Sequence, residues 1–417
     1  MADKPHQPHQ PHSDPIQTAI SKWTSTISPP TDDAAAASAW AQELSSNAPK
    51  RFTIYEPMAL LPAGSFGNPP WTTELARHSA AVTDSLWTTL LQELSRSEGR
   101  SKSRLTHLAA NEGIPLLRDQ GGGGGGGCDR REEENVMRSP SGLRMLHGDF
   151  GPPEPDCPPS RNDFANAFWV STKQNGILQT WAPRWTMFSR GNVKEKARLL
   201  GFPRAPPGSE EEEEGGGRSH VWAVDLYAGI GYFAFCYAKL GMRVLCWELN
   251  PWSVEALRRG ARLNKWSVDV FSRPGTSVPS EDMMASTARI VLLAEDNGIA
   301  RWRTEDMKKR RRGGPWLRDV RHVNCGLLPT SRLTWDCALS LTRTTTTAGQ
   351  PAWLHLHENV GEADVEPRRR EIELLLGGDP GEEGLNRCIR VDRVEKVKTY
   401  APGVWHCVFD VLVTRRE

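Results

Sequence analysis

The sequence lacks the features of a membrane, secreted or zinc-binding protein. No apolar run approaches the roughly 20 residues that a membrane span needs, and the first residues, MADKPHQPHQPH, contain no apolar signal core. The eight cysteines are scattered through apolar runs such as FAFCYA and form no CxxC pair, so they are expected in the core rather than on zinc. We therefore expect a cytoplasmic protein in a reducing compartment, with no membrane and no metal.

The chain also has almost no excess of either charge. Its 417 residues include 52 Lys and Arg against 51 Asp and Glu, which gives a formal net charge of +1. This balance neither demands nor excludes a nucleic-acid partner, because a basic face can exist within a neutral total. The length favours two or three domains, and the apolar share of 38% supports at least one core together with disordered segments.

Low-complexity segments interrupt the patterned sequence. Residues 1–50 are rich in His, Pro, Ser and Ala and predict a disordered tail. An accessory domain is expected over 51–165, with one amphipathic helix at 71–94 and a flexible loop at the seven glycines of 121–127. The rest, 166–417, is expected to be a second domain. Its low-complexity insertions are expected near 205–218, 272–286, 303–315 and 343–350.

The second domain alternates between strand and helix patterns. The runs VWAVDLYA, MRVLCWELN, ARIVLLAEDN and PAWLHLHENV predict strands, and helical patterns lie between them. A closing hairpin is expected in IRVDRVEKVKTYAPGVWHCVFDVLVTR. This alternation predicts an α/β fold, in which helices cover both faces of a mostly parallel sheet.

A glycine-rich turn follows the first of these strands. Asp225 ends the strand, and Gly229 and Gly231 let the backbone turn tightly and approach a ligand without a Cβ. The spacing is DxxxGxG rather than the GxGxxG of dinucleotide binders, which disfavours NAD, and no Walker-type GK[ST] follows. Taken alone, the two glycines fit a plain tight turn equally well.

Two further strand ends carry polar residues that suit a nucleoside. Glu248 ends the next strand, where a carboxylate can accept hydrogen bonds from ribose hydroxyls. Asp296 and Asn297 end the third strand, where a carboxylate can accept from the amine of adenine and an amide can meet a ring nitrogen. Three acidic strand ends together with two glycines favour an adenosine-type ligand, and the pattern resembles the class I S-adenosylmethionine (SAM)-dependent transferases.

The upstream segment narrows this resemblance. QNGILQTWAPRWTMFSRGNVKEK (174–196), followed by VDLYAGIGYFAF, WELNPWSVEALRRGARLN, EDN, HVNCGLLPTS and WLHLHENV, closely resembles the tRNA wybutosine-synthesising protein 2 family in its fungal form. The resemblance covers about 160–417 without the insertions, and MFSRGN is its most specific motif.

The resemblance implies a reaction in which SAM gives up its 3-amino-3-carboxypropyl group rather than its methyl. The acceptor would be carbon 7 of 4-demethylwyosine in tRNA(Phe), and 5′-methylthioadenosine would be released. A tRNA guanosine N1-methyltransferase of the same fold is the alternative, but its Asn-Leu-Pro motif is replaced here by CGLLPTS (325–331). A catalytically silent RNA-binding module is a third reading, and the intact Gly229, Gly231, Glu248 and Asp296 speak against it.

The same resemblance implies that Ser189 and Lys196 contact the cofactor. From the residues alone, Lys196 could pair with a carboxylate, or could simply lie on a solvated helix face. Ser189 or Asn192 could equally be the N-cap of the following helix. No side chain presents itself as a general base. His355 and His357 alternate along a strand, and we expect only one of them to face the site.

A tRNA partner would be bound chiefly through its phosphates. The candidate contacts are basic, and some of the sixteen tryptophans could stack on a flipped base. The basic candidates are Arg184, Arg190, Arg258, Arg259, Arg262 and the run 308–312.

Overall fold

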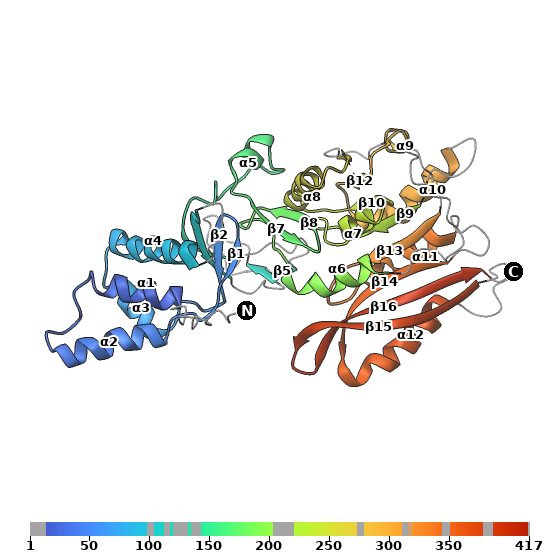
Figure 1. Ribbon diagram of the computed structural model, residues 1–417. Coiled ribbons are helices and arrows are strands. Elements are labelled where there is room, and N and C mark those ends of the chain that lie inside the picture. The colour runs from blue at the N-terminus through green and yellow to red at the C-terminus, as the bar shows by residue number, and fades with distance from the viewer. Residues whose placement is uncertain are drawn as a thin grey trace, which may run out of the picture. The chain divides into compact units, whose positions relative to one another are not determined.

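The computed structural model describes residues 14–97, 104–111, 117–119, 132–134, 143–202, 221–272, 279–310, 317, 319–343, 351–377 and 387–415. The chain divides into two compact units (Figure 1). The first comprises 1–154, 165–171 and 182–187, and the second comprises 155–164, 172–181 and 188–417. The chain thus passes between the units more than once, which differs from the single boundary expected at 165.

The first unit combines helices with a four-stranded sheet of order β1-β2-β3-β6. Its core is formed by aromatic and aliphatic side chains that include Trp23, Trp71 and Leu108. Its helices are α1 (Pro15–Thr24), α2 (Ala34–Ser46), α3 (Pro69–Ala76) and α4 (Ala80–Ser97). Its strands are β1 (Thr53–Tyr55), β2 (Met58–Leu61), β3 (His107–Ala110) and β6 (Arg144–His147), beside the separate pair β4 (Leu117–Asp119) and β5 (Glu132–Glu134).

The prediction of a disordered tail over 1–50 is wrong for the described residues 14–50, which contain α1 and α2. Asp14 caps α1 by accepting a hydrogen bond from the backbone N–H of Ile16 at 2.9 Å. One face of α1 buries Ile16, Ile20 and Trp23 in the core of the first unit. The Ser, Pro and Ala content of this segment hid a short apolar stripe at helical spacing.

The single helix predicted at 71–94 is two helices. α3 ends at Ala76 and α4 begins at Ala80. Glu74, in the last turn of α3, accepts hydrogen bonds from the side chains of Arg77 and His78 in the connecting turn. The predicted helical periodicity is therefore confirmed, but a turn at residues 77–79 divides the segment into two helices.

The second unit is built on an eight-stranded sheet of order β11-β12-β10-β9-β13-β14-β16-β15. The first six strands are parallel, and β16 pairs antiparallel with β14 and with β15. The strands are β9 (Trp222–Asp225), β10 (Arg243–Trp247), β11 (Val268–Phe271), β12 (Ile290–Leu293), β13 (Val320–Cys325), β14 (Ala352–Gly361), β15 (Arg387–Ala401) and β16 (Val404–Arg415). The predicted α/β fold with a mostly parallel sheet and a closing hairpin is confirmed.

Successive side chains of each buried strand point to opposite faces of this sheet, so both faces are apolar and both are covered by helices. On β9, Trp222 and Val224 lie in the core formed with α9 to α12, whereas Ala223 lies in the core formed with α6 to α8. The helices are α6 (Val193–Leu200), α7 (Ala234–Lys239), α8 (Pro251–Leu263), α9 (Ser280–Met284), α10 (Ala300–Arg310), α11 (Trp335–Arg343) and α12 (Val365–Gly377). No helix in the described part of the chain is long and apolar enough to cross a membrane.

Several local predictions differ from the structure. The stretch GILQTWAP, upstream of the strands predicted for the main sheet, forms β8 (Ile177–Trp181), which among the described strands pairs with β7 (Val170–Gln174) in a separate two-stranded sheet. Strand β11 lies in a segment whose weak pattern gave no prediction. Helix α9 lies inside the insertion expected near 272–286, and α10 extends to Arg310, inside the insertion expected near 303–315. The glycine run 121–127, the insertion 205–218 and residues 344–350 lie outside the described residues.

Candidate functional site

The glycine-rich turn after β9 adopts a conformation that requires its glycines. Gly229 and Gly231 have φ angles of +55° and +91°, in the left-handed region that other residues rarely adopt. A Cβ on Gly231 would lie 2.5 Å from the ring of Phe235, and a Cβ on Gly229 would lie 3.0 Å from the ring of Tyr232. Gly231 is therefore required by the packing of α7 as well as by the tight turn that the sequence predicts.

Asp225 is buried at the end of β9. Its Oδ1 accepts hydrogen bonds from Asn324 Nδ2 of β13 at 3.0 Å and from the backbone N–H of Tyr227 at 3.2 Å. Burial raises the pKa of this carboxyl to about 6, although the bond from Asn324 acts in the opposite direction. Asp225 thus anchors the start of the turn to the neighbouring strand.

Glu248, which follows β10, holds the same turn from the other side. Its Oε2 accepts from the backbone N–H of Gly229 at 2.7 Å, and its Oε1 accepts from the backbone N–H of Asn250 at 2.8 Å. Burial raises the pKa of Glu248 to about 7, and the nearby charge of Asp225 acts in the same direction. Each carboxylate oxygen retains a further lone pair for a ligand hydroxyl.

Asp296 and Asn297 follow β12 and bound the site on that side. Asp296 Oδ1 accepts from the backbone N–H of Gly298 at 2.6 Å and so caps the short helix η2 (Asn297–Ile299). Asn297 Nδ2 donates to the carbonyl oxygen of Leu226 at 2.6 Å. Asp225, Glu248 and Asn297 therefore all form hydrogen bonds with the backbone of the loop after β9. Their positions at the ends of parallel strands predict this meeting point.

The MFSRGN motif contacts this loop through Tyr232. The backbone N–H of Ser189 donates to Tyr232 Oη at 3.0 Å. Ser189 precedes the short helix η1 (Arg190–Asn192), and Asn192 precedes α6, but neither side chain makes a capping hydrogen bond. Asn192 therefore occupies the N-cap position of α6, and Ser189 occupies that of η1, but neither caps through its side chain. The Ser189 hydroxyl instead accepts a hydrogen bond from Lys398 Nζ at 3.2 Å.

Lys196 is a buried lysine, so the alternative of a solvated helix face is wrong. Its side chain is 1% exposed, and its ammonium donates to Gln174 Oε1 at 2.6 Å and to Gln179 Oε1 at 2.7 Å. The ammonium also lies 5.1 Å and 5.9 Å from the ring centres of Phe188 and Tyr232. Burial lowers its pKa to about 8. Tyr232 thus joins the glycine loop to both Ser189 and Lys196.

A buried polar row crosses the sheet beneath α6, and the sequence reading missed it. His322 Nδ1 and His355 Nε2 are 3.0 Å apart, and His355 Nδ1 lies 2.7 Å from Asp410 Oδ1. Arg198 of α6 forms ion pairs with Asp410 and with Glu195. This row, defined as His322, His355, Asp410, Arg198 and Glu195, fixes α6 to three strands.

The expectation that only one of His355 and His357 faces the site is wrong in its geometry. Residues two apart on a strand point to the same face, and both rings lie on the α6 side of β14. His357 Nδ1 is 2.9 Å from His406 Nε2 of β16. Burial lowers the pKa of His357 well below its usual value, and lowers that of His406 to about 4 with help from the charge of Lys398. Both rings are therefore neutral near pH 7.

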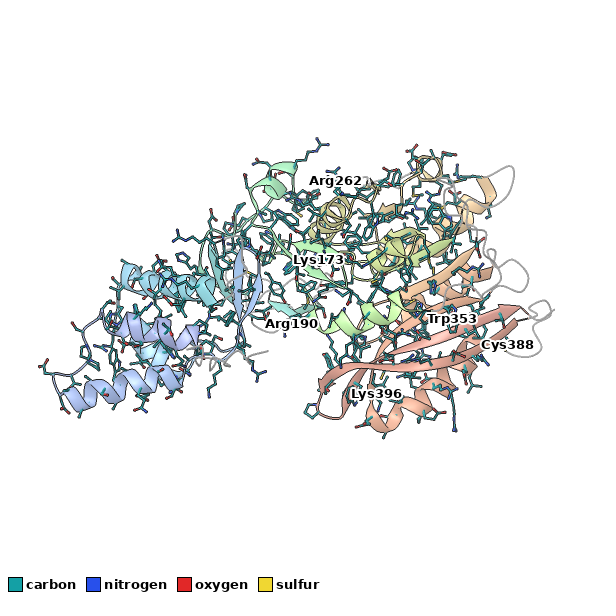
Figure 2. All side chains as sticks on the ribbon, in the orientation of Figure 1. Lys173, Arg190, Arg262, Trp353, Cys388 and Lys396 are labelled. Atoms are coloured by element: carbon teal, nitrogen blue, oxygen red, sulfur yellow. The ribbon has the colours of Figure 1, made fainter. Side chains whose placement is uncertain are left out.

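The predicted basic contacts differ in the exposure of their side chains. Arg258 and Arg259 both form ion pairs with Glu255, whereas Arg262, near the end of α8, has an exposed side chain (Figure 2). Arg190 is exposed on η1 (Figure 2). Arg184 belongs to the first unit and is half-buried.

The basic run 308–312 lies only partly in the described chain. Arg310 forms ion pairs with Asp306 and Glu281, and residues 311–312 lie outside the described ranges. Among the described residues, no three His, Cys, Asp or Glu side chains are grouped so as to hold a metal ion.

Comparison with known proteins gives the family. No protein-family model matches the chain. It is 37% identical over 365 residues to tRNA wybutosine-synthesizing protein 2 of Schizosaccharomyces pombe, covering 87% of this chain and 72% of the relative. It is 31% identical over 392 residues to the protein of the same name from Saccharomyces cerevisiae, covering 87% of this chain and 74% of that one.

A solved structure supports the same fold. TYW2 of P. horikoshii, determined in complex with MeSAdo, matches with a TM-score of 0.52 at 18% identity, over 96% of this chain and 100% of that chain. This likeness concerns the fold alone, which is that of the class I SAM-dependent transferases. With the two yeast relatives, it leads to one conclusion: the chain belongs to the tRNA wybutosine-synthesising protein 2 family.

Proposed function

We propose that this protein transfers the 3-amino-3-carboxypropyl group of SAM to carbon 7 of 4-demethylwyosine, beside the anticodon of tRNA(Phe). SAM is the co-substrate, and 5′-methylthioadenosine is released. Membership of the family supports the reaction. The observation that carries the cofactor assignment is the single loop after β9, which is held by Glu248 and Asn297 on one side and contacts Ser189 and Lys196 through Tyr232.

The nucleoside of SAM is assigned to the strand ends. Glu248 binds the ribose hydroxyls through the lone pairs that its two backbone hydrogen bonds leave open. Asp296, whose side chain is exposed, accepts from the adenine amine, and Asn297 meets a ring nitrogen. The MeSAdo complex of the P. horikoshii relative supports a nucleoside ligand for this fold.

The methionine end of SAM is assigned to Ser189 and Lys196. The sulfonium activates three carbons, and the enzyme selects among them by aiming one carbon at the nucleophile. In the transfer, carbon 7 of the base forms a bond to Cγ of the arm, and the S–Cγ bond breaks with its electron pair left on sulfur. The proton from carbon 7 passes to solvent. We assign no side chain as a general base, and positioning is the main contribution of the protein.

The acceptor tRNA is assigned to the exposed basic side chains of the second unit, foremost Arg190 and Arg262. Their role would be to neutralise phosphates, which supplies affinity rather than sequence specificity. We also assign the reaction to the cytoplasm. The seven described cysteines, all of them free thiols, support a reducing compartment.

The deciding experiment combines the purified protein, SAM labelled in its carboxypropyl carbons, and tRNA(Phe) from cells that lack this step. Label in the tRNA together with 5′-methylthioadenosine is the expected result. Formation of S-adenosylhomocysteine instead would identify a methyltransferase and refute the proposal. Absence of SAM binding would point to a silent RNA-binding module.

A further inference from the structure

Lys398 of β15 reaches into the MFSRGN segment from a strand 209 residues later in the chain. Its ammonium donates to the Ser189 hydroxyl at 3.2 Å. The absence of a side chain at Gly191 makes room for it, since a Cβ there would lie 2.5 Å from Lys398 Cδ. The position of this lysine is therefore built by both segments.

The charge of Lys398 is not neutralised by the protein. Among the described residues, no carboxylate lies within ion-pair distance of its ammonium. Lys396, two residues earlier on β15, is exposed and pairs with Glu362 at 3.1 Å (Figure 2). Lys398 is half-buried, and burial lowers its pKa. A half-buried ammonium whose only described hydrogen bond is to a hydroxyl is suited to an anionic ligand.

Lys196 adds a second positive charge near the same segment. Its ammonium is bound by two amide oxygens, and again no carboxylate of the described chain pairs with it. Ser189 and Lys196 both contact Tyr232. The Ser189 hydroxyl thus has the ammonium of Lys398 as its hydrogen-bond partner. Tyr232, which accepts from the backbone N–H of Ser189, also lies beside the ammonium of Lys196.

We propose that Lys398, together with the Ser189 hydroxyl, binds the carboxylate of the aminocarboxypropyl arm of SAM. This rests on the proposed function, and it adds a residue of the closing hairpin that the sequence does not single out as a ligand contact. A carboxylate fits a single recessed ammonium beside one hydroxyl, whereas tRNA phosphates are typically met by exposed Lys and Arg. The carboxylate belongs to the group that is transferred, so Lys398 holds the arm rather than the leaving nucleoside.

This anchor has a direct consequence for the reaction. The carboxylate lies at one end of the short arm and the electrophilic Cγ at the other, so fixing the carboxylate orients the S–Cγ bond toward the base. Carbon 7 forms its bond to Cγ, the S–Cγ electron pair stays on sulfur, and the proton of carbon 7 leaves to solvent. Lys398 takes no part in bond making, and it keeps its proton throughout. It is a positioning residue for Cγ.

The test compares three ligands on the full-length protein by isothermal titration calorimetry: SAM, decarboxylated SAM and 5′-methylthioadenosine. Lys398→Met should weaken SAM about ten- to a hundredfold, the usual range for loss of a charge-assisted hydrogen bond. It should leave 5′-methylthioadenosine and decarboxylated SAM unchanged, because neither carries the carboxylate. Lys398→Arg should restore part of the affinity, and Lys396→Met is the matched control that should change nothing.

Each other outcome overturns the inference in a distinct way. An unchanged SAM affinity in Lys398→Met excludes a carboxylate contact. If that variant instead loses tRNA binding in a filter assay while SAM affinity holds, Lys398 is a phosphate contact. Equal losses for all three ligands mean a structural role. Failure of the wild-type protein to bind SAM at all refutes the proposed function itself, and the inference with it.

Discussion

Lys196 provides the sharpest physical test, because its burial predicts a pH-dependent stability. The pKa of its ammonium is lowered from 10.5 to about 8 in the folded protein. A shift of this size corresponds to about 3 kcal/mol of unfavourable charge burial at pH 7. In Lys196→Met this cost disappears, but the side-chain oxygens of Gln174 and Gln179 lose their donor, at about 1–3 kcal/mol each. The net effect at pH 7 therefore lies between about 1 kcal/mol of stabilisation and about 3 kcal/mol of destabilisation, so the value at one pH does not isolate the charge.

The pH dependence separates the two terms. Between the folded pKa near 8 and the unfolded value of 10.5 the unfolded chain binds more protons at this site, so stability rises with pH. From pH 7 to pH 10 the wild-type protein should gain about 2.5 kcal/mol in the free energy of unfolding relative to Lys196→Met. The neighbouring thiol of Cys236, whose pKa burial raises to about 12, stays neutral over this range.

Urea denaturation of both proteins at pH 7 and pH 10 measures this difference directly. Lys194→Met, at an exposed lysine of the same helix, is the control and should track the wild-type protein at both values. A wild-type-minus-variant difference that is the same at pH 7 and pH 10 would refute the assignment of a charged, buried Lys196.

Three further perturbations follow from the site. Glu248→Ala should weaken SAM binding about tenfold or more in calorimetry, and an unchanged affinity would exclude the ribose contact. Gly231→Ala should destabilise the fold by about 1–3 kcal/mol more than Gly241→Ala. Both glycines have φ near +90°, but only a Cβ on Gly231 would meet the ring of Phe235. Equal melting temperatures for the two variants would contradict this. Asp410→Asn should cost about 3–5 kcal/mol in urea unfolding because it leaves a buried arginine without its full partner set, and a loss under about 1 kcal/mol would show that the buried polar row contributes little.

The parallel core was predictable because its strands are short apolar runs bounded by turn residues. The same logic located Asp225, Glu248 and Asn297, since the carboxyl ends of parallel strands meet at one edge whatever the side-chain detail. Strand β11 escaped notice because only part of VDVF is apolar and its residues are half-exposed at the sheet edge. Helices α1 and α2 were not predicted because the Ser, Pro and Ala content of residues 1–50 is typical of disordered segments and their apolar stripes are short.

The interactions that were missed in the site are those that join distant segments. Nothing in the local sequence around Lys398 distinguishes it from Lys396, and only the pairing of β15 with β16 brings it to Ser189. Similarly, the burial of Lys196 depends on Gln174 and Gln179, which come from the β7–β8 hairpin. Long-range pairing of this kind has no signal in a single sequence.

The contribution of the last two strands has a consequence for biosynthesis. β15 and β16 supply Lys398 and Asp410, and both residues act on the segment from Ser189 to Arg198, about half a chain earlier. During translation, N-terminal parts emerge and fold first, so the Ser189 segment leaves the ribosome long before the residues that complete it. On the proposed role of Lys398, the nascent protein holds the carboxylate of SAM only weakly until β15 has been made, and chains that end before residue 398 should bind SAM more weakly even where their parallel sheet has formed.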